Sequence, residues 1–89
     1  IPKVHTKRCL IEPLTLEELC SIPPHFRAVW NSRDVKTGAL KKETFRDARK
    51  LWNGWLCQAS NIKTIADIEE NADAILVGTH LREFEKSLN

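Results

Sequence analysis

Residues 41–59 read KKETFRDARKLWNGWLCQA, and this stretch carries the strongest structural signal of the chain. On a helix, successive side chains are separated by about 100°. That rotation gathers the apolar residues on one broad side, a basic group on a second side and two acidic residues on a third. The apolar residues are Phe45, Ala48, Leu51, Trp52, Trp55, Leu56 and Ala59. We therefore predict one long helix from about Lys41 to Ala59 that buries Trp52 and Trp55 and is weakened by about 1 kcal/mol at Gly54 relative to alanine.

The second side of this predicted helix, here called the basic stripe, is made of Lys42, Arg46, Arg49, Lys50 and Asn53. Cations in such a row suit DNA phosphates, and arginine or asparagine also suits base edges in the major groove. The alternative is a solvated surface on which Arg46 pairs with Glu43 and Lys50 with Asp47. The basic stripe therefore predicts either a contact with duplex DNA or an ordinary helix surface.

Residues 1–13 are predicted to form a basic extended arm, because Pro2 and Pro13 resist helix formation. Lys3, Lys7 and Arg8 would place this arm along a phosphate backbone or in a minor groove. The alternative interpretation of the arm is a frayed terminus without a binding role.

Further helices are predicted outside residues 41–59. A capping box at Thr15 to Glu18 starts a short helix that ends near Ser21, and Pro24 suits the first position of another. Residues 31–38 are rich in turn formers and predict a loop. Thr64 begins a short helix, and a last helix runs to about Leu88. Together these signals predict an all-α fold, a small bundle of four to five helices forming one domain over residues 1–89.

Composition limits the class of protein. A chain of 89 residues with 42% hydrophobic content fits one small globular domain, and no apolar run approaches a membrane span. The absence of methionine suggests a fragment of a longer protein. Three widely spaced cysteines do not form a disulfide framework, which predicts an intracellular location in the cytoplasm or nucleus. Residues 1–60 carry a net charge of +5 and residues 61–89 a net charge of −3, so the first part favours an acidic partner.

Catalytic and metal-binding patterns are missing from the sequence. It contains no glycine-rich phosphate loop and no nucleophile motif, and its histidines and cysteines lack the spacings of a zinc site. We therefore predict that the chain is not an enzyme and that it uses no cofactor, no metal and no small-molecule substrate.

Residues 43–88 resemble the core-binding domain of tyrosine recombinases and phage integrases. The matching residues are Thr44, Phe45, Leu51, Trp52, Trp55 and Leu56, then Ile62, Ile65, Asp67 and Ile68, then Ala74, Leu81 and Phe84. The resemblance implies a SAM-like helical bundle that clasps DNA in recombination and integration, while a separate domain holds the catalytic residues. Residues 64–84 also look like a tetracycline-repressor-type helix-turn-helix, but Asp73 replaces the turn glycine and this part of the chain is acidic.

The predicted function is that of a DNA-binding helical module of a larger intracellular protein, in the manner of a recombinase core-binding domain. The alternative is a protein–protein interaction module, a helical adaptor that uses exposed tryptophan or phenylalanine as anchors and has no nucleic-acid role. A structural subunit of a ribonucleoprotein would share the basic stripe. Steep weakening by salt would distinguish nucleic-acid binding from an apolar interface.

Overall fold

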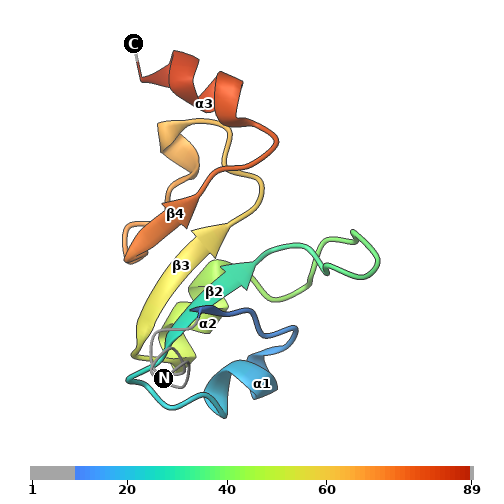
Figure 1. Cartoon of the computed structure of the whole chain (residues 1–89), viewed down its shortest axis with the longest axis vertical. Helices are drawn as coiled ribbons and strands as arrows, with labels where there is room; N and C mark the ends of the chain where they lie inside the picture. The colour runs from blue at the N-terminus through green and yellow to red at the C-terminus, as the bar shows by residue number, and fades with distance from the viewer. Residues whose placement is uncertain (1–9, 89) are drawn as a thin grey trace, which may run out of the picture.

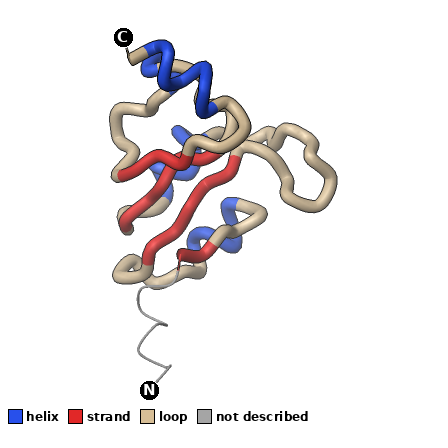
Figure 2. Tube along the Cα trace, turned by 45° about the horizontal axis from the view of Figure 1, so that its top comes forward, coloured by secondary structure: helices blue, strands red, loops and turns tan. Residues whose placement is uncertain are grey.

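The computed structural model describes residues 10–88 and is built around a four-stranded parallel sheet (Figure 1). The strands are β1 (Leu10–Ile11), β2 (Arg27–Asn31), β3 (Trp55–Ala59) and β4 (Ala74–Leu76), side by side in chain order. The helices are α1 (Leu16–Cys20), α2 (Phe45–Leu51) and α3 (Leu81–Ser87), with a 3-10 turn η2 (Ile65–Asp67) (Figure 2). The prediction of an all-α bundle is therefore wrong, and the fold is α/β. The helical bundle that the recombinase resemblance implies is not the observed fold.

The connections between the strands all pack on one face of the sheet, here called the helix face. On this face, Ala28 of β2 lies beside Leu56 of β3, and Trp30 lies beside Gln58. The main core cluster joins these strand residues to Leu19 of α1 and to Phe45 and Ala48 of α2. Helices α1 and α2 therefore cover the same side of the sheet.

Gln58 also holds the third connection on the helix face. Its side-chain amide donates to the Asp67 carbonyl at 2.8 Å and accepts from the Glu69 amide at 2.8 Å. These two bonds tie the η2 segment to the middle of β3 and satisfy the buried amide group. Every connection therefore packs on the helix face. The opposite side of the sheet, which no connection covers, is here called the open face.

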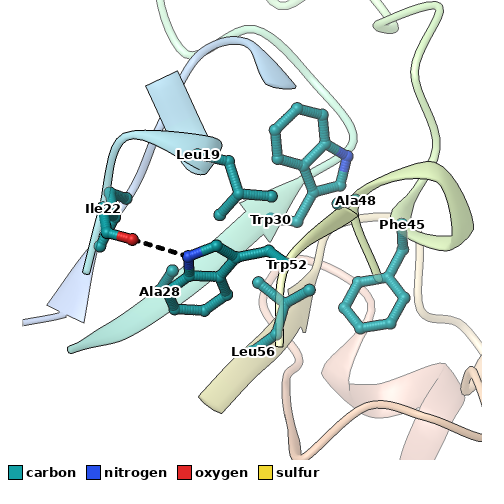
Figure 3. Packing of buried hydrophobic residues seen from close by; sticks show 8 residues of the cluster. All are labelled: Leu19, Ile22, Ala28, Trp30, Phe45, Ala48, Trp52 and Leu56. Carbon is teal, nitrogen blue, oxygen red and sulfur yellow. Dashed lines mark hydrogen bonds between the residues drawn. The ribbon is translucent and has the colours of Figure 1, made fainter. Parts of the chain in front are cut away.

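Two tryptophans lie at the centre of the core between the sheet and its helices (Figure 3). Trp30 is fully buried, and its indole donates to the Glu43 carbonyl at 3.4 Å. Trp52 is also buried, and its indole donates to the Ile22 carbonyl at 2.8 Å. The predicted burial of Trp52 is confirmed, whereas Trp55 is only half-buried and lies on the open face.

The helix predicted over residues 41–59 forms only over Phe45–Leu51, and the rest of the prediction is wrong. Helix α2 starts at a capping box, in which Thr44 Oγ1 accepts from the Asp47 amide and Asp47 Oδ2 accepts from the Thr44 amide. It ends at Trp52, whose backbone is extended, and the five-residue strand β3 begins at Trp55. The apolar run from Trp55 to Ala59 is as compatible with a buried parallel strand as with a helix, because periodicity cannot separate the two over so short a length.

Other predicted segments have mixed outcomes. Helix α1 is confirmed: the Thr15 side chain accepts from the Glu18 amide at 3.1 Å and the helix ends before Ser21. The helix predicted after Pro24 is wrong, since residues 27–31 form β2. The last predicted helix is shortened to α3, because Ala74–Leu76 is a strand. The end of the predicted basic arm joins the sheet as β1.

The predicted loop after β2 is confirmed. Residues 32–40 project from the sheet as a short hairpin-like loop (Figure 1), closed by a bridge between Arg33 and Leu40. Gly38 has a φ of 76°, which suits the tight turn at its tip. Within residues 10–88, no helix combines the length and the apolar character that crossing a bilayer requires.

Candidate interaction surface

The structure brings only part of the basic stripe together. Arg46, Arg49 and Lys50 lie on α2, whereas Lys42 precedes the helix and Asn53 follows it. The three helical cations line a groove of about 490 Å³ between α2 and residues 66–71. Glu69 and Glu70 line the same groove, so its wall carries both signs of charge.

Arg46 and Arg49 are engaged by acidic and carbonyl partners of the same chain. Arg46 Nε lies 2.8 Å from Glu69 Oε1, although its side chain is 78% exposed. Arg49 is only 17% exposed and lies 3.2 Å from Asp73 Oδ2. Its guanidinium also donates to the carbonyls of Trp52 at 2.6 Å and Gly54 at 2.8 Å. Arg49 thus clamps the end of α2 to the starts of β3 and β4, which is a structural role.

The three remaining predicted nucleic-acid contacts, Lys3, Lys7 and Arg8, lie outside the described residues. Among residues 10–88, Lys50 is the one cation of α2 that makes no ion pair. The prediction of a DNA contact by the basic stripe stays a prediction, with two of its arginines already paired.

Three rows of side chains cross the open face. The strand register aligns Leu10, Arg27 and Trp55 in the first row, Val29, Cys57 and Ala74 in the second, and Asn31, Ala59 and Leu76 in the third. The cluster on this face consists of strand residues alone. Its second row is nearly buried, so the outer rows supply the accessible side chains.

The first row presents an arginine stacked on an aromatic ring. Arg27 Cζ lies 4.9 Å from the centroid of Trp55, and Leu10 beside them is 49% exposed. Tryptophan and arginine are the residues most enriched at the energetic centres of protein interfaces. This row therefore has the chemistry of a docking site.

The third row forms part of a groove of about 380 Å³ at the carboxyl ends of β2, β3 and β4. Val35 of the projecting loop lies on one side of the groove, and residues 78–80 before α3 line another part of it. Val35 and Leu76 are both more than half exposed. The groove thus combines accessible apolar side chains with the polar groups of Asn31 and His80.

The backbone at the end of β3 turns sharply to shape this groove. Ser60 and Asn61 both have left-handed φ angles, 75° and 60°, and Asn61 donates to the Ser32 hydroxyl at 3.4 Å. Asparagine tolerates this left-handed conformation better than most residues, which suits Asn61 to the turn after β3. His80 Nδ1 lies 2.9 Å from Glu83 Oε1, which fixes the ring at the groove.

The titratable groups on the open face do not form a reactive centre. Burial raises the pKa of the Cys57 thiol, which keeps it protonated and poorly nucleophilic. Within residues 10–88, no cluster of three or more histidine, cysteine or acidic side chains is arranged to hold a metal ion.

Sequence reasoning missed Arg27, Trp55 and Leu76 as surface residues. The available signal was the similarity of RAVWN at residues 27–31 and WLCQA at residues 55–59, two segments of equal length with apolar centres that each follow a Pro- or Gly-containing turn. Reading them as a pair of parallel strands would have placed Arg27 beside Trp55. Comparisons with protein-family models, with curated proteins and with solved structures each found no match.

Proposed function

We propose that this chain is a protein-interaction module that binds a partner through the open face and the groove at its carboxyl end. The observation that carries the proposal is the position of Leu76. This residue is 56% exposed, lines the groove and belongs to the third row of the open face. An accessible apolar residue in a groove that continues a sheet face is a typical anchor point for a partner.

Sheet order supports the same proposal. In open α/β sheets, ligand crevices form where the strand order reverses. Here the order is sequential and has no reversal, so the connections leave one whole face uncovered.

Nucleic-acid binding is the less favoured alternative. Arg46 and Arg49 already face Glu69 and Asp73, and a phosphate would have to compete with these carboxylates. An intracellular location is kept as part of the proposal, supported by Cys20 and Cys57, which are free thiols.

The test is a selection of binders from a random peptide library on the immobilised chain. Leu76→Asp should weaken the selected peptides by at least about 10-fold, as expected for loss of an interface anchor. Leu51→Asp is the matched control, because Leu51 on α2 is 57% exposed but lies away from the groove. Arg27→Ala should weaken those peptides that reach the first row.

Two outcomes would contradict the proposal. One is a set of peptides that bind Leu76→Asp and Leu51→Asp equally well. The other is binding of generic duplex DNA that weakens steeply with salt and is lost in Lys50→Ala, which would restore the basic stripe as the functional surface.

A further inference from the structure

Strand β4 is the outer edge of the sheet. In the described part of the chain it pairs with β3 on one side and with no strand on the other (Figure 1). An edge strand presents unpaired backbone amides and carbonyls, which are a template for another strand. The unused side of β4 is therefore a second feature that a partner can recognise.

The backbone direction of β4 follows from the bonds of Leu56 and from the strand register. The Leu56 amide donates to Asp73 Oδ2 and the Leu56 carbonyl accepts from the Asp73 amide, both at 2.9 Å, so Leu56 and, two residues on, Gln58 face β4. In this parallel pair Cys57 lies opposite Ala74, so the groups that meet Leu56 and Gln58 belong to Ala74 and Leu76, and the amide and carbonyl of Ile75 point away from β3. Ile75 offers the unpaired groups of the edge.

The entry to β4 is held firmly. Asp73 Oδ2 accepts from the Leu56 amide at 2.9 Å and lies 3.2 Å from the Arg49 guanidinium. An edge that is already fixed in the extended conformation loses little further entropy when a strand is added to it.

Most of the devices that usually protect a sheet edge are missing from β4. Residues 74–77 are Ala-Ile-Leu-Val, with no lysine, no proline and no inward charge. The strand is short, three residues, so an added strand gains only the outward amide and carbonyl of Ile75. Side-chain contacts and charge must supply the rest of the affinity.

Charge selects between the possible occupants of the edge. Residues 61–89 contain three basic and six acidic residues, a net charge of −3. Exposed Glu70 precedes the strand, and Glu83, whose side chain is 61% exposed, follows it. A second copy of the chain would bring the same acidic surface and be repelled, whereas a segment with basic flanks would be attracted.

We propose that the outer edge of β4 binds an extended, basic-flanked segment of a partner protein as a fifth strand of the sheet. Alternate side chains of this segment would lie beside Leu76 on the open face and beside Ile75 on the helix face. This inference rests on the proposed interaction function and specifies how the partner docks.

The test uses the isotope-labelled full chain and an acetylated probe peptide, Lys-Lys-Val-Thr-Val-Thr-Val-Lys-Lys. Binding should slow hydrogen exchange of the Ile75 amide by about 10-fold or more, while the Ala74 and Leu76 amides, already directed at β3, change less. A peptide with glutamate in place of lysine should bind at least about 10-fold more weakly.

Two controls separate strand addition from other binding. Ile75→Pro removes the outward amide without removing a bond to β3, and should weaken the probe by about 10-fold. If this variant fails to fold, a probe with methylated backbone nitrogens provides the same test on the wild-type chain, because it cannot donate to the edge.

Any of three other results would overturn the inference. Binding that leaves the Ile75 amide unprotected and tolerates backbone methylation excludes strand addition, while the library peptides and Leu76→Asp still decide the proposed function. Equal binding of both flank types excludes the basic segment. Protection of the edge without any peptide, together with a dimer in sedimentation, assigns the edge to a second copy.

Discussion

Gly54 gives the sharpest stability test, because the helix predicted from the sequence and the observed fold require effects of opposite sign. In the middle of a helix, Gly54→Ala would stabilise the chain by about 1 kcal/mol. In the observed fold, Gly54 is buried between α2 and β3, and a Cβ built there would lie 2.7 Å from the Pro24 carbonyl oxygen and closer still to the Trp52 ring. The Trp52 ring cannot move freely, since its indole is bonded to the Ile22 carbonyl. The Pro24 oxygen belongs to the backbone and cannot rotate away as a side chain would.

The expected cost of Gly54→Ala is that of overpacking a core, about 1–3 kcal/mol. For a domain of this size, each kcal/mol shifts the Tm by about 4–8 °C, so the Tm should fall by roughly 4–24 °C. Thermal unfolding followed by tryptophan fluorescence measures this shift directly. Gly78→Ala is the matched control, because a Cβ at Gly78 meets no atom within 4 Å, and its Tm should stay near that of the wild type. A rise in Tm for Gly54→Ala would refute the tight approach of the backbone to Trp52 and Pro24.

Three further results are expected. Arg49→Ala should cost about 1–3 kcal/mol in a urea titration, since it leaves the Trp52 and Gly54 carbonyls without their donor, whereas Arg46→Ala, at an exposed pair, should leave the midpoint unchanged. Two backbone amides donate to Asp67 and lower its pKa, so the stability it contributes is present above the unfolded pKa of about 3.9 and is lost as the pH falls through the folded pKa. The urea midpoint should therefore drop below about pH 4 in the wild type and less in Asp67→Asn; equal pH profiles would contradict this. Cys20 is exposed and Cys57 is buried with a raised pKa, so a thiol reagent followed by peptide mass mapping should label Cys20 at least about 10-fold faster in the native chain.

Local signals in the sequence were sufficient where one short segment determines its own conformation. The Thr15 cap starts α1, the Thr64 region forms the η2 turn, and residues 32–38 of the turn-rich segment form a loop. In each case a side chain bonds to a backbone group three or four residues away, or the residues themselves favour a turn. Such interactions do not depend on the rest of the fold.

The candidate surface could not be predicted in the same way. Arg27 and Trp55 are brought together by strand register, and Leu76 reaches the groove only because β4 pairs with β3. The basic stripe was predicted from helical spacing, but Asp73 and Glu69, distant in sequence, take up two of its arginines.

The sequence by itself determined the caps, the loop after β2 and the burial of Trp52. Only the tertiary structure decided that residues 27–31 and 55–59 are strands. A segment of five residues with an apolar centre can be buried as a helix turn or as a central parallel strand, so its side chains alone do not determine which of the two structures forms. The choice is made by pairing: the backbone groups of β2 and β3 satisfy one another across the sheet, and Gly54 allows the chain to pass close to Trp52 at the start of β3.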